Sequence, residues 1–290
     1  MEIQTNLKRT VNYLSSVIGS RGYLEMKPLG LAADYIEGEL RSYGYDVLIQ
    51  PYDFEGRIYK NIIAELQGKK TQEKILVIGA HYDTVIGTPG ADDNASGIAG
   101  LLEIARLLSN KNLDKTVHFV AFTLEEPPLF MTRHMGSYVY ARSLKKKREN
   151  IEGMVSLEMI GYFKDSPKSQ SFPLPFFNWF YPNKANFIAL VGNLSSKSFI
   201  SSFKSGFKKG TDLPVESLST ISLVPGMDFS DHSSFYRFGY KALMVTDTAF
   251  YRNTHYHEIT DREETLDYRR MTEVVLGIRS AIEKLGMYLP

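Results

Sequence analysis

Residues 90–97 read GADDNASG, and the segments on either side of this stretch decide the fold. Before it, residues 74–80 read KILVIGA, a continuous apolar run of the kind that forms a strand buried on both faces. After it, the apolar side chains of residues 95–108 repeat at helical spacing. A buried strand, a glycine-rich loop and a helix in this order indicate an α/β protein, because a βαβ unit begins in this way.

The same alternation of strands and helices extends along the chain in both directions. We expect strands at residues 45–52, 59–66, 74–80, 117–124, 154–160, 187–191, near Ile221, and at 242–246. We expect helices at residues 5–18, 29–40, 95–108, 135–147, 197–207 and 265–285. This order predicts a mostly parallel sheet with helices on both of its faces.

The alternation stops between residues 163 and 184. This stretch is rich in Ser and Pro and contains six aromatic side chains: Phe172, Phe176, Phe177, Trp179, Phe180 and Tyr181. We interpret it as an insertion over the sheet rather than as a separate domain. The chain is therefore expected to form a single catalytic domain over residues 1–290 that carries this aromatic insertion.

The composition excludes several classes of protein. Of the 290 residues 43% are hydrophobic and 23% are charged, as in ordinary globular proteins, and the net charge is only +1. Such a chain has no overall field that would hold nucleic acid or an anionic membrane. It contains no cysteine, which excludes disulfides, thiolate nucleophiles and cysteine-bound zinc. No apolar run approaches the ~20 residues that span a bilayer, and the N-terminal residues lack a signal-peptide pattern, so we expect a cytoplasmic protein.

Acidic and imidazole side chains follow the ends of the predicted strands. They are His81, Asp83, Asp92, Asp93, Glu125, Glu126, Glu158, His255 and His257. Ligands of α/β proteins bind at the carboxyl ends of parallel strands, and clustered carboxylates need a compensating charge. Oxygen and imidazole ligands without sulfur suit Zn²⁺, with Mn²⁺ or Co²⁺ as substitutes. The candidates are too many for one tetrahedral zinc, but they fit two metals about 3.5–4 Å apart that share a carboxylate.

Six short motifs, in this order, resemble those of the M28 zinc aminopeptidases. They are residues 81–84 (HYDT), 90–97 (GADDNASG), 125–126 (EE), 157–161 (LEMIG), 230–232 (SDH) and 256–261 (YHEITD). The resemblance implies a three-layer α/β/α sandwich with a mixed, mostly parallel central sheet. It also implies metal-dependent hydrolysis of the N-terminal peptide bond of a peptide substrate.

The resemblance further implies a set of metal ligands for two zinc ions per chain. His81 and Glu158 would be ligands of the first metal, and Glu126 and His257 would be ligands of the second. Asp93 would bridge the two metals. Asp92 is the neighbouring alternative to Asp93, and His255 is the alternative to His257.

Other residues would act around these ligands. Glu125 would stay free of metal and act as the general base, and Asp83 would orient the imidazole of His81 by accepting its other N–H. We expect Asp231, His232 and Tyr256 to lie behind the ligands or on the substrate side, with simple structural hydrogen bonding as the alternative for Asp231 and His232.

The sequence departs from the family pattern in three places. Glu158 stands where the family more often has Asp, and its extra methylene can change the metal affinity or the preferred metal. Pro127 and Pro128 follow the Glu pair, where many members have a glycine and a short loop. The insertion at 163–184 aligns with no fixed counterpart.

Three other functions compete with a peptidase. A glutaminyl cyclase-like acyltransferase would use a single zinc on N-terminal Gln; such enzymes commonly have Trp before the ligand His, where this chain has Tyr256. A binding module without activity would have no reason to keep the complete set of ligands and base. A serine hydrolase is disfavoured because Ser96 lacks the Gly two residues before it that a nucleophile elbow requires. We therefore favour a zinc aminopeptidase, as a monomer or a homo-oligomer.

Overall fold

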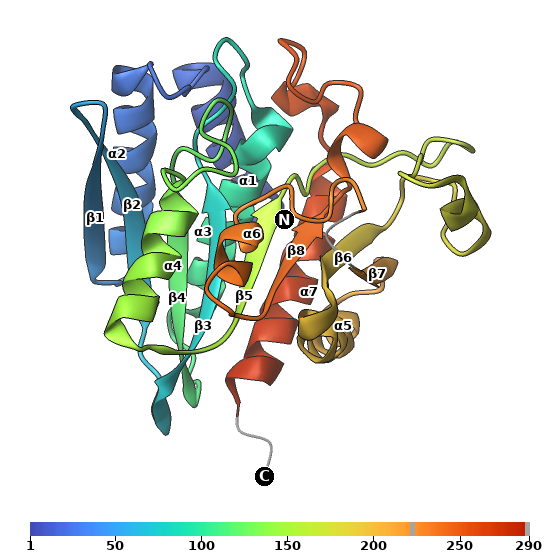
Figure 1. Ribbon diagram of the computed structural model, residues 1–290. Helices are drawn as coiled ribbons and strands as arrows, with labels where there is room; N and C mark the ends of the chain where they lie inside the picture. The colour runs from blue at the N-terminus through green and yellow to red at the C-terminus, as the bar shows by residue number, and fades with distance from the viewer. Residues whose placement is uncertain (221–223, 288–290) are drawn as a thin grey trace.

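The computed structural model describes residues 1–220 and 224–287, except for the side chains of residues 71–73. Within this part of the chain, eight strands form one sheet (Figure 1). The strands are β1 (Val47–Phe54), β2 (Arg57–Leu66), β3 (Thr71–His81), β4 (Lys115–Phe122), β5 (Asn150–Glu158), β6 (Ile188–Asn193), β7 (Val215–Thr220) and β8 (Ala242–Thr246). Their order across the sheet is β1-β2-β4-β3-β5-β8-β6-β7. Strands β4, β3, β5 and β8 are parallel, as are β6 and β7, whereas β1–β2, β2–β4 and β6–β8 pair antiparallel. The predicted mixed, mostly parallel sheet is confirmed.

Helices cover both faces of this sheet (Figure 1). One face carries α1 (Glu2–Asn12), α2 (Met26–Ser42), α3 (Gly97–Leu108), α5 (Lys197–Gly210) and α7 (Tyr268–Gly286). The other face carries α4 (Gly136–Lys147) and the short helix α6 (His232–Tyr236). The predicted three-layer α/β/α sandwich is therefore confirmed.

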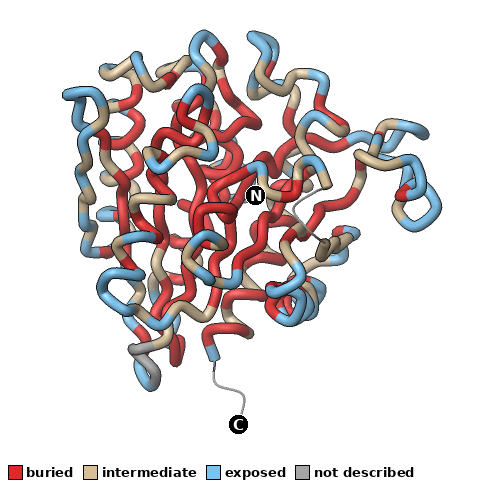
Figure 2. The backbone as a smooth tube through the Cα atoms, in the orientation of Figure 1, coloured by how far each residue is buried: buried red, intermediate tan, exposed pale blue. Residues whose placement is uncertain are grey.

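Two hydrophobic cores, one on each face of the sheet, hold the three layers together. Successive side chains of a strand point to opposite faces. On β3, Leu76 and Ile78 belong to the larger core below α2, α3 and α7, and Ile75 and Val77 belong to the smaller core below α4 and α6. This explains why residues 74–80 form a continuous apolar run, and Figure 2 shows the central strands as the most deeply buried part of the chain.

The structure differs from the sequence-based expectations at a few element boundaries. The expected helix 5–18 begins as α1 and ends as a π-helical turn, Tyr13–Ile18. The segment Ala91–Ser96 before α3 is kinked, because Asp93 and Asn94 have non-helical backbone angles. Helix α6 is too short to produce a helical pattern in the sequence and was not expected. The strand expected near Ile221 lies at Val215–Thr220, while Ile221 itself is outside the described residues. In the part of the chain that the structure describes, no helix is both long and apolar enough to cross a membrane.

The carboxyl ends of β3, β4, β5 and β8 lie at one edge of the sheet, as parallel pairing requires. The loops that carry the sequence-predicted site residues leave the sheet at this edge. The insertion at residues 163–184 leaves between β5 and β6, forms a short 3₁₀ turn at Pro175–Trp179, and projects from the β6–β7 side of the molecule (Figure 1).

Candidate metal centre

The first group of site residues surrounds His81, the last residue of β3. Its Nε2 atom lies 3.4 Å from Asp93 Oδ1 and 3.3 Å from Glu158 Oε2, and Glu158 is the last residue of β5. The side chain of His81 is only 1% exposed. We call His81, Asp93 and Glu158 the inner half of the centre, because two of its three residues are fixed at the ends of central strands.

The second group surrounds His257, in the loop after β8. Its Nε2 atom lies 3.2 Å from Asp93 Oδ2 and 3.3 Å from Glu126 Oε2, and its side chain is 30% exposed. We call Asp93, Glu126 and His257 the outer half. Asp93 belongs to both halves, since its two carboxylate oxygens face different imidazoles.

The spacing of these atoms fits a metal better than it fits direct hydrogen bonds. His81 Nε2 and Glu126 Oε1 are buried, and within the described residues neither has a hydrogen-bond partner. Ligands bound tetrahedrally at about 2.0–2.1 Å from a zinc ion stand about 3.3–3.4 Å from each other, which matches the 3.2–3.4 Å separations in both halves. One ligand atom each from His81, Asp93 and Glu126 also lie within 4.8 Å of one another.

Asp83 links the two loops that carry these ligands. The Nδ1–H of His81 donates to the backbone carbonyl of Asp83 at 3.2 Å, and the carboxylate lies farther away, at 3.6 Å. The carboxylate of Asp83 instead accepts the backbone N–H groups of Glu125 and Glu126, at 3.2 and 3.1 Å. Asp83 therefore leaves Nε2 of His81 facing Asp93 and Glu158, and it also fixes the Glu pair.

Asp261 plays a comparable part for the bridging residue, although sequence reasoning gave it no role. Its carboxylate accepts the backbone N–H groups of Asp92 and Asp93, at 2.9 and 3.0 Å. The carboxylate of Asp92 is engaged elsewhere: it accepts the N–H of Gly161 and the amide of Asn253. Asp92 therefore faces away from the imidazoles, and Asp93 is the one of the two that faces them.

Residues 230–232 lie behind the inner half. The hydroxyl of Ser230 donates to Glu158 Oε2 at 2.7 Å, a contact that sequence reasoning did not assign. Asp231 is fully buried, neither of its oxygens has a hydrogen-bond partner among the described residues, and burial raises its pKa to about 7. His232 Nε2–H donates to the carbonyl of Met227 at 2.8 Å, which identifies His232 as a structural histidine.

The remaining predicted site residues flank the two halves. Glu125 is buried, its Oε2 lies 3.9 Å from His81 Nε2, and burial raises its pKa well above the ordinary value. The ring of Tyr256 stacks on His257 with the ring centroids 3.7 Å apart. His255, by contrast, hydrogen-bonds Thr260 and is not among the residues that face Asp93.

The electrostatics of the centre favour bound protons or bound cations. Burial alone would lower the pKa of His81, but the charges of Glu158 and Glu125 raise it well above its ordinary value. Burial also opposes protonation of His257, but Asp93 and Glu126 raise its pKa to about 10. Because a metal binds the neutral imidazole, a cation that enters this centre displaces protons from it.

Three of the nine non-glycine residues with positive φ among the described residues lie at or next to the candidate centre. Leu124, Met159 and His257 have positive φ angles of 60°, 50° and 60°. This left-handed conformation is uncommon for residues other than glycine, and it persists where the surrounding structure imposes it. Leu124 precedes the Glu pair and Met159 follows Glu158, so two of these residues lie where the chain leaves a central strand.

A buried cation that sequence reasoning missed connects this centre to the N-terminal helices. Arg21 is 0% exposed, and its backbone N–H donates to Thr84 in the loop after β3. Within the described residues, no acidic side chain forms a salt bridge with the guanidinium of Arg21. Among the nearby charges, those of Asp83 and Asp261 contribute most to keeping Arg21 protonated. The guanidinium donates to the carbonyl oxygens of Leu14, Gly19, Tyr82, Pro89 and Gly90.

The family model described as peptidase family M28 matches residues 61–282, which include all the residues of both halves. The chain belongs to peptidase family M28. The predicted family and the predicted metallopeptidase are therefore confirmed.

This M28 chain matches most of one curated relative but only about half of another. The protein named Uncharacterized protein YfbL of Escherichia coli strain K12 is 40% identical over 280 residues, which cover 94% of this chain and 85% of that protein. Leucine aminopeptidase 1 of Blastomyces gilchristii is 29% identical over 227 residues, which cover 73% of this chain but only 52% of that protein.

Solved structures show that this M28 chain shares its fold with enzymes of different names. The zinc aminopeptidase BSAP of Bacillus subtilis matches with a TM-score of 0.77 and 18% identity over 99% of this chain and 95% of its own. A glutaminyl cyclase of Bacteroides thetaiotaomicron matches with a TM-score of 0.70 and 19% identity, over 97% of each chain. Because one fold carries both names, the reaction of this chain has to be argued from its site.

Proposed function

We propose that this M28 chain is an aminopeptidase that holds two zinc ions and uses Glu125 as its general base. The observation that carries the proposal is the position of Asp93, whose two oxygens face His81 and His257 at 3.4 and 3.2 Å. A carboxylate shared in this way is what a two-metal site requires. The first ion would be held by the inner half and the second by the outer half.

Two zinc ions, when bound, supply Lewis-acid polarisation of the scissile carbonyl and neutralise the charge of the carboxylates. Glu125 would take the proton of the attacking water and later deliver it to the leaving amine. Burial raises the pKa of Glu125, which favours its uptake of a proton from the attacking water. The backbone hydrogen bond from Glu125 to Asp83 would hold its side chain beside the centre.

The acidic surroundings also explain a preference for the free end of a peptide. Five carboxylates lie around the centre: Asp83, Asp93, Glu125, Glu126 and Glu158. A substrate whose first residue carries a protonated α-amine would be attracted to this cluster, and an N-acetylated peptide would lose that attraction.

The test combines metal analysis with a panel of peptides. We expect about two zinc ions per chain, release of the first residue from unblocked peptides, and loss of that activity after complete metal removal. The Glu125→Gln variant keeps the shape of the side chain but cannot take a proton, so it should retain both metals and lose hydrolysis. Full activity of this variant, or of the metal-free chain, would contradict the proposal.

Peptides that begin with Gln distinguish an aminopeptidase from a glutaminyl cyclase. An aminopeptidase releases free Gln, whereas a cyclase produces a pyroglutamyl peptide of unchanged length. Mass spectrometry of the products separates the two, and a pyroglutamyl product together with one zinc per chain would favour the cyclase.

A further inference from the structure

We propose that the aromatic insertion at residues 163–184 sets the size of the first side chain that the enzyme accepts, and that it favours branched aliphatic side chains over aromatic ones. The inference rests on the proposed aminopeptidase function and adds a specificity determinant to it. The side chains assigned this role are Phe172, Phe177 and Tyr181.

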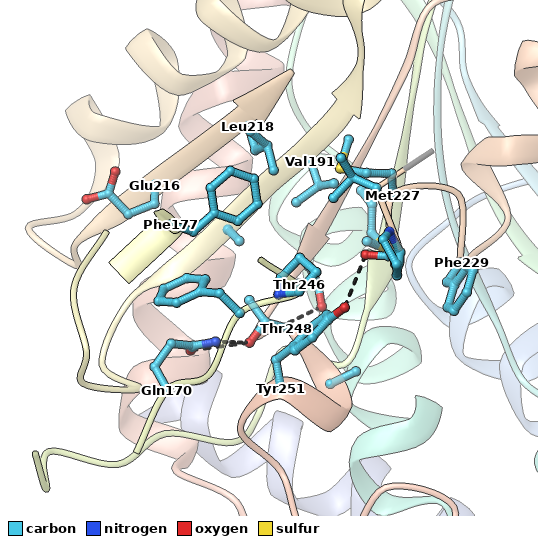
Figure 3. Close-up of a pocket in the computed structure, with 18 of the residues that line it drawn as sticks. Gln170, Phe177, Val191, Glu216, Leu218, Met227, Phe229, Thr246, Thr248 and Tyr251 are labelled. Carbon is cyan, nitrogen blue, oxygen red and sulfur yellow. Dashed lines mark hydrogen bonds between the residues drawn. The ribbon is translucent and has the colours of Figure 1, made fainter. Parts of the chain in front are cut away.

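Figure 3 shows a cavity that shares lining residues with the surroundings of the candidate metal centre. Glu158 of the inner half and Tyr256, which stacks on His257, are among the residues that line it. The side chain of the first residue, which precedes a scissile bond held at the centre, could therefore enter this cavity. The floor is formed by strands β6, β7 and β8, whose residues Val191, Leu218 and Met244 line it.

The insertion forms one wall of this cavity with a cluster of three aromatic rings. The ring centroid of Phe177 lies 6.4 Å from that of Phe172 and 5.8 Å from that of Tyr181, and Phe172 and Tyr181 are 5.8 Å apart. Both pairs that include Phe177 are edge-to-face, a favourable arrangement for aromatic side chains. All three side chains line the cavity.

Hydrogen bonds fix both ends of this aromatic wall. The hydroxyl of Tyr181 donates to the carbonyl of Ser217 on β7 at 3.1 Å. At the other end, the backbone N–H of Ser171 donates to the carbonyl of Tyr251 at 2.9 Å. The wall is therefore anchored to the catalytic domain, so it can limit the size of a bound side chain.

The insertion has a second set of aromatic side chains that does not touch the cavity. Trp179 is 82% exposed and Phe180 is 74% exposed, whereas Phe177 is 9% exposed. The insertion thus offers a matched control. A substitution of Phe177 removes part of the wall, whereas a substitution of Trp179 removes a large aromatic side chain of the same segment that does not line the cavity.

The size and lining of the cavity indicate which side chain fits. Its volume is about 110 Å³, while an apolar cavity of about 150 Å³ holds a benzene molecule. A Leu or Ile side chain is therefore a better fit than a Phe or Trp side chain. The carboxylate of Glu216 points away from the labelled aromatic and aliphatic side chains in Figure 3 and lies 3.8 Å from Lys204, so it offers no partner for a basic first residue.

The test compares kcat/KM for Leu, Phe, Ala and Lys p-nitroanilides in the wild type and two variants. The wild type should favour Leu over Phe and Lys by about 10-fold or more, since one methylene in an apolar pocket already changes kcat/KM by about 10–200-fold. Phe177→Ala should raise kcat/KM for Phe relative to Leu by about 10-fold, mainly through a lower KM for Phe. Trp179→Ala should leave this ratio unchanged.

A gain of activity toward Phe cannot result from misfolding, so this outcome supports the proposal directly. An unchanged Phe-to-Leu ratio in a folded Phe177→Ala variant would overturn it, as would an equal change in Trp179→Ala. If Phe177→Ala does not fold, Phe177→Leu applies the same test with a smaller cavity. A wild type that releases no amino acid from any substrate would overturn the proposed function itself, whereas an active wild type with an unaltered ratio would overturn only this inference.

Discussion

The inner and outer halves of the candidate centre share Asp93 but are built on different supports. In the inner half, His81 and Glu158 end two central strands, and the His81 side chain is 1% exposed. In the outer half, His257 comes from a loop, has a positive φ angle and is 30% exposed. Rigid elements position ligands more precisely than loops do. The difference indicates a firmly held inner position and a more accessible, more easily exchanged outer position.

The most severe way to disturb this arrangement is to remove the residue that the halves share. Asp93→Ala should lose both metals and nearly all activity. Even the loss of a partner behind a ligand costs about 10–100-fold in metal affinity, so the loss of the shared ligand should cost more at both positions. Metal analysis and peptidase assays check this, and a variant that keeps one metal at wild-type affinity would show that Asp93 is not shared.

The halves should also empty in a defined order. When a limiting amount of chelator is added, we expect the outer metal to leave first, because His257 is partly exposed and His81 is buried. The variant His257→Ala should therefore hold about one metal per chain, and the matched variant His81→Ala should lose more metal and more thermal stability. Metal content followed against time measures the order. Simultaneous release of both metals in the wild type would remove the proposed difference between the halves.

A smaller effect is expected from the residue that supports the inner half. Ser230 donates to Glu158, so Ser230→Ala should weaken metal binding at the inner half by about 10-fold or more without removing a ligand. Ser234, which is also buried and hydrogen-bonds Ser137 instead, is the control. Zinc titrations of the three proteins measure the difference, and equal affinities in Ser230→Ala and Ser234→Ala would assign Ser230 no part in the centre.

The mildest expected effect concerns acid stability behind the inner half. Burial lowers the pKa of His232 from 6.5 to about 4, so the unfolded chain binds a proton there more readily than the folded chain between these pH values. The free energy of unfolding therefore falls as the pH falls, by roughly 1 kcal/mol at pH 5.5 relative to pH 8 from this group. In His232→Gln this contribution should be absent, since the Gln amide reaches the position of Nε2 and can still donate to Met227 but does not titrate.

Denaturant unfolding of both proteins at pH 8 and pH 5.5 measures this contribution as the difference between their two losses. All other titrating groups are common to both chains and cancel in the comparison. Identical losses would mean that His232 titrates normally in the folded protein.

The sequence was sufficient to predict the parts of the molecule that follow a local pattern. The continuous apolar runs predicted β3, β4 and β5, and the short motifs at their ends predicted which acids and imidazoles would meet. Arg21 could not be found in this way, because it belongs to no motif and its contacts join residues far apart in the chain. Asp261 is the last residue of the motif at 256–261, but the motif did not reveal its role, because its contacts are equally distant in the chain. Asp261, for example, contacts a backbone N–H 169 residues away.

The backbone also contains information that the side-chain pattern does not. Nothing about Leu124 or Met159 in the sequence indicates a left-handed conformation, since both are residues for which it is unfavourable. The aromatic insertion illustrates the same limit. Its composition indicated a departure from the sheet, but only the structure separates Phe177, which lines the cavity, from Trp179, which faces solvent.

Arg21 has a practical consequence for dissecting this protein. The family match begins at residue 61, so a fragment designed from it would lack α1, α2 and Arg21. Such a truncation removes the donor that binds the carbonyls of Tyr82, Pro89 and Gly90, in the loops between His81 and Asp93. The first sixty residues therefore help to hold the loops of the candidate centre in place, and a fragment meant to keep that centre should begin upstream of Arg21.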